Sequence, residues 1–145
     1  MKTKAEIATQ DYQGKFNCAQ STIAVFAEDY GLNLKDALRI GAGLGGGCHS
    51  AEICGAVSAG AAIIGLKHGH TEPNPEQYAI CRAKTNEFVT KFKEANEGNV
   101  TCLKLMGLNI TTPDGRAQAL EQNLFSTRCK DLVASAVNIL EELGY

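Results

Sequence analysis

Cysteine is the residue of this chain best suited to chemistry, and six cysteines are present. They stand at Cys18, Cys48, Cys54, Cys81, Cys102 and Cys129. A thiolate binds metal ions and attacks disulfides, whereas a free thiol can also serve as a small core hydrophobe. Cytosolic reductants keep thiols reduced, so structural disulfides are not expected in that compartment. The cysteines therefore indicate metal binding, redox chemistry or simple packing.

Four of these cysteines are predicted near helix starts. Cys18, Cys102 and Cys129 each come within two residues of a side chain that can cap a helix. Those caps are Asn17, Thr101 and Thr127. Cys54 is expected about one turn into a helix over residues 50–69. In the first turn of a helix, unpaired backbone N–H groups and the positive end of the helix dipole favour a thiolate over a thiol. We therefore expect the four to converge on one catalytic or metal-binding site.

The spacing of the cysteines excludes the familiar small zinc modules. The sequence contains no C-x-x-C, and dozens of residues separate Cys18, Cys54, Cys102 and Cys129 from one another. A shared site must then be assembled by side chains on different helices, as metal sites in helical bundles commonly are.

Four stretches of the chain carry a family resemblance. They read NCAQSTIAVFAEDYGL, GAGLGGGCHSAEICGAVSAG, VTCLKLMG and CKDLVASAVNILEEL. Their order over nearly the whole chain resembles the family of redox-active proteins labelled by its C_GCAxxG_C_C pattern. The resemblance implies that Cys18 is the first family cysteine, Cys54 the one in CGA, and Cys102 and Cys129 the last two.

The same resemblance implies a helical fold and a redox role for these cysteines, and it brings no substrate with it. The family is also similar to a segment found in some multihaem cytochromes that carry an iron–sulfur centre. One departure stands out, because CGAxxG would place a glycine at position 59. The chain has Ala59 there, followed by Gly60.

The glycine-rich loop over residues 41–47 is the main irregular feature. It matches G-x-G-x-x-G, but a helix rather than a strand is expected before it, which argues against dinucleotide binding. We expect a tight bend that brings backbone N–H groups to the sulfur site. The predicted cofactor-binding residues are Gly45, Gly46, Gly47, Cys48 and His49. Cys81 is expected in the core.

Residues that can cap a helix, apolar residues spaced three or four apart and terminating glycines recur along the chain. The alternation of apolar and polar residues that is typical of strands is nearly absent. The pattern predicts an all-α, single-domain bundle over residues 1–145, with about six to seven helices and the glycine-rich loop. Its helices are predicted at 4–13, 17–31, 33–40, 50–69, 75–96, 116–124 and 127–143, with a short turn of helix at 101–106.

Composition excludes several classes of protein. Apolar residues make up 44% and charged residues 21%, as in ordinary globular domains. A net charge of −2 without a basic cluster argues against nucleic acid as a partner. No apolar run suits a signal peptide or a membrane span, so a cytoplasmic location is expected.

Three functions remain open at this point. The first is an iron–sulfur or related metal cluster on Cys18, Cys54, Cys102 and Cys129, used for electron transfer with a redox partner protein. The second is cofactor-free thiol–disulfide exchange. The third is a helical accessory protein whose cysteines hold zinc or pack. Whether the chain is an enzyme depends on which of these three functions it has. A homodimer is compatible with each of the three.

Overall fold

The computed structural model describes residues 1–145 and contains eight α-helices and no β-sheet. The predicted all-α class is confirmed, with more helices than the six to seven expected. The helices are α1 (Lys4–Glu6), α2 (Cys18–Ala24), α3 (Leu34–Ala42), α4 (Gly55–His68), α5 (Pro75–Ala95), α6 (Cys102–Met106), α7 (Pro113–Glu121) and α8 (Arg128–Glu142). A π-helical segment (Ile7–Tyr12) continues α1, and a 3₁₀ turn (Ala27–Tyr30) follows α2.

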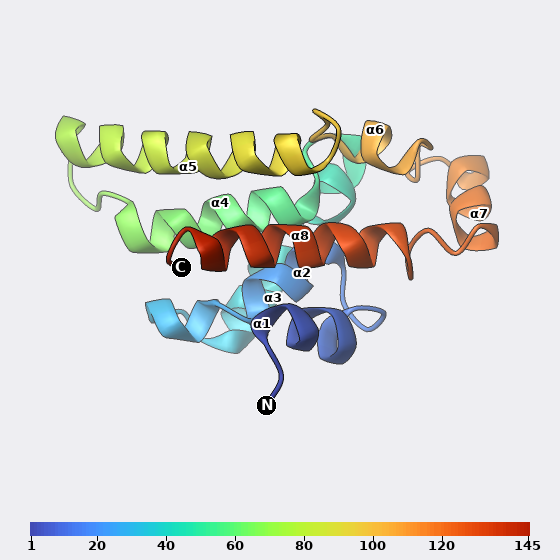
Figure 1. The fold of residues 1–145 in the computed structure, drawn as a ribbon, viewed down its shortest axis with the longest axis horizontal. Helices are drawn as coiled ribbons and strands as arrows, with labels where there is room; N and C mark the ends of the chain where they lie inside the picture. Colours follow the sequence, from blue (N-terminus) through green and yellow to red (C-terminus); the bar gives the residue numbers. More distant parts are fainter.

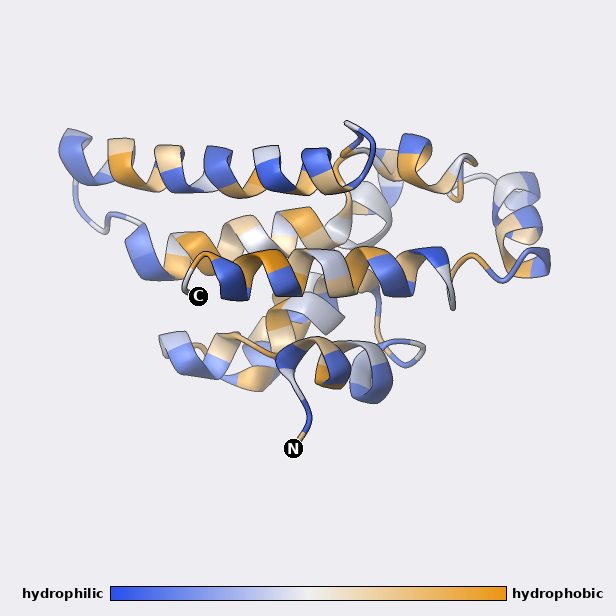
Figure 2. Cartoon of the chain, viewed as in Figure 1, coloured by the Kyte–Doolittle hydropathy of each residue, from blue (hydrophilic) through white to orange (hydrophobic).

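Helices α4, α5 and α8 run side by side along the long axis of the molecule, with α1, α2 and α3 against the side away from α5 (Figure 1). Helix α4 packs between α5 and α2, and Figure 2 shows it as largely apolar, whereas α5 carries many hydrophilic residues. Helices α6 and α7 extend one end of the bundle. None of the helices has the length and apolar character needed to cross a membrane.

Helix starts follow the capping residues in most cases. The Asn17 side chain accepts a hydrogen bond from the Gln20 N–H at 2.8 Å, and the Gln20 side chain accepts one from the Asn17 N–H at 3.0 Å. This capping box fixes the first turn of α2. Helix α7 begins at Pro113 rather than at the expected residue 116, because Thr112 caps it and Pro113 suits its first turn.

Helix α4 begins five residues later than the sequence predicts. The chain before it turns in a left-handed conformation, with φ angles of 57° at Cys48, 53° at His49 and 59° at Ala51. Ile53 then pairs with Thr101 in an isolated antiparallel bridge. Small apolar residues made 50–69 resemble one helix, but this backbone cannot continue as a right-handed helix. Cys54 is consequently the N-cap residue of α4 instead of an interior residue.

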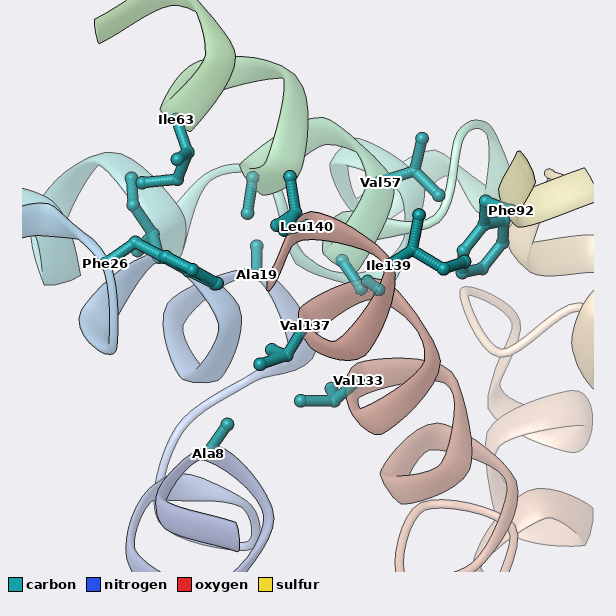
Figure 3. Close-up of a cluster of buried hydrophobic side chains, with 14 of the residues drawn as sticks. Ala8, Ala19, Phe26, Val57, Ile63, Phe92, Val133, Val137, Ile139 and Leu140 are labelled. Atoms are coloured by element: carbon teal, nitrogen blue, oxygen red, sulfur yellow. The ribbon is translucent and has the colours of Figure 1, made fainter. Parts of the chain in front are cut away.

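Two hydrophobic clusters make up the core. The larger, of 22 buried residues, joins α1, α2, α4, α5 and α8, and Figure 3 shows part of it, including Phe26, Ile63 and Val137. The smaller, of 4 buried residues, is Cys102, Met106, Ile110 and Ala119. Cys54 belongs to the larger cluster with Cys18 packed against it, whereas Cys129 packs against the smaller one.

Candidate redox site

A cavity of about 870 Å³ is lined by residues of both hydrophobic clusters and opens to solvent beside exposed residues such as Lys15 and Ser126. The thiol-bearing residues Cys18, Cys54, Cys102 and Cys129 all line this cavity. They come from the start of α2, the N-cap of α4, the start of α6 and the first turn of α8. The fold thus brings four cysteines that are distant in sequence to the wall of one cavity.

Backbone hydrogen bonds hold Cys54 beside Cys102. The N–H of Cys54 donates to the carbonyl of Val100 at 2.9 Å, and the N–H of Cys102 donates to the carbonyl of Glu52 at 2.6 Å. These bonds flank the bridge between Ile53 and Thr101. The starts of α4 and α6 are therefore tied together, and both cysteines are buried.

Cys18 has the environment of a stabilised thiolate. The Cys54 thiol donates a hydrogen bond to its sulfur and is the main cause that lowers the pKa of Cys18 to about 6. Burial acts against this effect, and backbone N–H groups of Gly46, Ala19 and Gly55 support it. Donors to the charged form favour that form. At neutral pH, Cys18 is thus the ionised member of a hydrogen-bonded pair.

The other three cysteines keep their protons at neutral pH. The hydrogen bond to Cys18, followed by burial, raises the pKa of Cys54 well above its usual value. Burial raises the pKa of Cys102 to about 11 and that of Cys129 to about 12, with the Cys18 charge adding to both. The expected thiolate is therefore found only at Cys18, where the Cys54 hydrogen bond is the main cause. The helix start is outweighed by the hydrogen bond to Cys18 at Cys54 and by burial at Cys102 and Cys129.

Gly55 is required for the approach of Cys18 to α4. A β-carbon at position 55 would stand 2.6 Å from the Cys18 sulfur and 2.9 Å from the carbonyl oxygen of Leu44. Both distances are too short for a real contact, so any side chain at Gly55 would displace Cys18 or the loop. Glycine follows the cysteine here for steric reasons.

Met106 adds a fifth sulfur atom to the cavity wall. The Cys129 thiol donates to the Met106 Sδ at 3.5 Å, which links α8 to α6. The Arg128 side chain strengthens that link by donating to the carbonyl of Leu105 at 2.9 Å.

No three His, Cys, Asp or Glu side chains converge on a point where they could hold one metal ion. The predicted metal ligands are therefore not arranged as a ready site for a single ion such as zinc. Instead, Cys18 and Cys54 form a hydrogen-bonded pair at the larger hydrophobic cluster, whereas Cys102 belongs to the smaller cluster and Cys129 packs against that cluster with its thiol on Met106.

A family model described as "Putative redox-active protein (C_GCAxxG_C_C)" matches residues 16–143. The chain belongs to this family. The match spans the segments that carry Cys18, Cys54, Cys102 and Cys129, so the redox character implied by the resemblance is confirmed at the level of the family. No curated protein and no solved structure matches the chain.

The departure from the family pattern at Ala59 lies outside the cavity. Ala59 is fully buried in the core, and Gly60 lies directly against the Phe88 ring, which a β-carbon would strike. Glycine at this part of α4 thus serves the packing of α5 on α4. The methyl group of Ala59 takes no space from the sulfur site.

The glycine-rich loop of this family member divides into two parts. Gly46, in a left-handed conformation with φ of 60°, and His49 line the cavity. The His49 Nε2 lies 2.8 Å from the carbonyl of Ala42, which holds the ring against α3. A β-carbon at Gly45 would strike the side chain of Asn17, the N-cap of α2, and one at Gly47 would strike the backbone of Glu52, so close packing explains both glycines.

Two cysteines lie outside the cavity. Cys48 is exposed on the loop, and Cys81 is half-buried on α5, at the edge of the core rather than inside it. The cofactor-binding roles of Gly45, Gly46, Gly47, Cys48 and His49 stay predictions, and only Gly46 and His49 reach the cavity wall.

Sequence reasoning missed several residues of the site. It gave no role to Gly55, Met106, Gln13, Lys15, Arg116 and Lys130, all of which line the cavity. Gly55 could have been noticed from its place in CGA, where the residue after a cysteine lacks a side chain. The others carry no local signal, since they reach the cavity only through the packing of the helices.

Proposed function

We propose that this protein is an electron carrier in which Cys18, Cys54, Cys102 and Cys129 hold an iron–sulfur cluster. The observation that carries the proposal is the lining of one cavity by four cysteines from four segments of the chain. Cysteine thiolates are the usual ligands of such clusters. When bound, a cluster of this kind supplies reversible electron transfer.

The donor set fits a cluster better than a single ion. In a two-iron cluster with four cysteine ligands, each iron takes two thiolates. The hydrogen-bonded Cys18 and Cys54 suit one iron, and Cys102 and Cys129, which both lie at the smaller hydrophobic cluster, suit the other, although no three donors converge on one ion. N–H groups of Gly46 and Gly55 bond to the Cys18 sulfur, and such bonds help to set a cluster's potential.

The proposal includes a redox partner protein and a cytoplasmic location for the electron carrier. An electron carrier exchanges electrons with a redox partner protein, and the exposed side of the cavity is where that exchange takes place. A cytoplasmic location agrees with cysteines that are free in the structure.

A second function is favoured by the hydrogen bond between Cys18 and Cys54. The Cys18 thiolate can attack one sulfur of a substrate disulfide, forming a mixed disulfide and releasing the other sulfur as a thiolate. Cys54 then loses its proton and attacks Cys18, which leaves a Cys18–Cys54 disulfide and a second substrate thiol. The substrate is reduced, the pair is oxidised, and a dithiol reductant restores it.

One preparation separates the two functions. Protein purified without oxygen is measured for iron, acid-labile sulfide, free thiols and visible absorption. The cluster predicts a brown protein with about two irons and two sulfides per chain. A larger iron count would keep the cluster but reject the two-iron arrangement. Colourless protein that loses two thiols on mild oxidation, and regains them with a dithiol, would support disulfide exchange instead.

A further inference from the structure

The cavity offers more than a sulfur site. Its volume of about 870 Å³ lies within the roughly 300–1,000 Å³ of small-molecule sites. Beyond the cysteines, its wall includes the apolar side chains of Phe16, Leu120 and Phe125, all of them partly or fully exposed. These side chains provide an apolar surface next to the thiols.

Apart from the Cys18 thiolate, the charged side chains of the cavity are all cationic. Lys15, Arg116 and Lys130 line it, whereas none of the chain's 16 Asp and Glu residues does. The three come from separate segments, and the structure's ion pairs, Lys2–Asp11 and Lys4–Asp29, involve none of them. Three cationic side chains outnumber the one thiolate, and a concave surface with an excess of one sign of charge attracts the opposite charge, so this cavity favours an anion.

Two further contacts at the cavity wall involve Phe125. The Arg116 guanidinium stands 5.2 Å from the centre of the Phe125 ring, which places a cation beside an apolar wall. The Gln13 amide donates from Nε2 to the Phe125 carbonyl at 3.3 Å, while its Oε1 is buried without a hydrogen-bond partner. No other side-chain nitrogen or oxygen in the protein is buried and unpaired.

We infer that the cavity binds a small organic anion beside the cysteines. A carboxylate or phosphate lies among Lys15, Arg116 and Lys130, and an apolar part packs on Phe16 and Phe125. This site goes beyond the proposed electron carrier, since it holds whether or not the sulfurs carry a cluster. It gives the protein a low-molecular-weight ligand within reach of the redox centre.

The test compares three probes of one shape that differ in charge. They are 4-hydroxyphenylacetate (anionic), tyrosol (neutral) and tyramine (cationic), each titrated into metal-free, reduced protein and followed by ¹H–¹⁵N NMR. The anion should bind at least about fivefold more tightly than tyramine, since even exposed ion pairs contribute up to about 1 kcal/mol. The Gln13 side-chain amide and the backbone amides of Thr111 and Ser126 should shift.

A matched pair of double variants shows where the charge acts. Arg116→Gln with Lys130→Gln should weaken binding of the anion at least about fivefold. Arg82→Gln with Lys84→Gln removes the same charges from α5, and Arg82 also stands over an aromatic ring, at 5.4 Å from the Tyr78 centre. That control should leave the affinity unchanged.

Four results would overturn the inference. One is equal binding of the three probes, and another is equal weakening by both double variants. The third is an anion-induced shift confined to residues away from the cavity. Binding of a poly-glutamate peptide without binding of the small anion would assign the surface to an acidic protein instead. Since the titration uses metal-free protein, its failure says nothing about the iron and sulfide content that tests the electron carrier.

Discussion

The sulfur of Cys18 lies against the backbone of Gly55, so close that a β-carbon on residue 55 would stand only 2.6 Å from that sulfur. This contact places the first cysteine of the family pattern at the start of α4, beside the second, Cys54. The four-cysteine cavity therefore depends on one residue that has no side chain.

Replacement of Gly55 by alanine should disrupt the site. Gly55→Ala would force Cys18 or Leu44 to move, because the new methyl group has no free space. We expect a lower free energy of unfolding, by about 1–3 kcal/mol, as for an overpacked core. We also expect the alkylation rate of Cys18 at pH 7 to fall, because the thiolate loses its N–H donors.

Gly65→Ala is the matched control for this change. Gly65 lies on the same helix, and a β-carbon there meets nothing within 4 Å. That variant should be as stable as the parent or slightly more so, since alanine favours helix. Equal loss of stability and of Cys18 reactivity in both variants would contradict the packing argument.

The ionisation of Cys18 can be followed by alkylation of the metal-free, reduced protein. Because the pKa of Cys18 is lowered to about 6, its reaction with iodoacetamide should reach half its maximum near pH 6 and fall below that pH. Cys54→Ala removes the main donor and should move this midpoint upward. Cys81→Ala, on α5 outside the cavity, should leave it unchanged.

The capping box at Asn17 should affect both stability and reactivity. Asn17→Ala removes the hydrogen bond to the Gln20 N–H and should cost about 1 kcal/mol of unfolding free energy. It also loosens the turn that begins with Cys18, so the alkylation midpoint of Cys18 should rise.

Asn74 provides the comparison, since it caps α5 in the same way by accepting from the Gln77 N–H at 3.0 Å. Asn74→Ala should lower stability by a similar amount and leave Cys18 unaffected, because α5 contributes no residue to the cavity. A shift of the Cys18 midpoint in this variant would show that general loosening, rather than the α2 turn, controls the thiolate.

Stability of the metal-free protein should decline at alkaline pH. The pKa of Cys102 is raised to about 11 and that of Cys129 to about 12. The unfolded thiols ionise near pH 8.5, so between that pH and the folded values the unfolded chain binds fewer protons. Each such thiol lowers the unfolding free energy by about 1.4 kcal/mol per pH unit in this range.

Urea unfolding at pH 8.5 and pH 10 in the presence of a reductant measures this decline. Cys129→Ala should reduce the pH dependence, whereas Cys81→Ala should change it much less. An identical pH dependence in the parent and the Cys129 variant would contradict the assignment of a raised pKa to that thiol.

The sequence predicts the fold of this protein better than the details of its site. Asn17, Asn74 and Thr101 are recognisable caps, and the helices that follow them begin where the sequence predicts. The end of α2 is wrong in the prediction, because the helix stops at Ala24 and a 3₁₀ turn covers Ala27–Tyr30 before Gly31. The Thr112–Pro113 pair carries the same signal as Asn74–Pro75, so the true start of α7 was predictable but overlooked. These features are local, and local sequence determines them.

The start of α4 was not predictable in this way. Positive φ angles at Cys48, His49 and Ala51 are unusual for residues with a side chain, and nothing in their types announces them. The unequal acidities of the cysteines are likewise not local. They depend on the Cys54 hydrogen bond to Cys18 and on burial, both of which arise only when α2 and α4 pack together.

The most direct test of a shared redox site uses six single variants, each with one cysteine replaced by alanine. Each protein is reconstituted anaerobically with ferrous iron and sulfide, and bound iron and visible absorption are measured, with circular dichroism as a check of folding. Replacement of Cys18, Cys54, Cys102 or Cys129 should abolish most of the iron and colour, whereas replacement of Cys48 or Cys81 should leave both intact. Full iron and colour after loss of any of the first four would contradict the account.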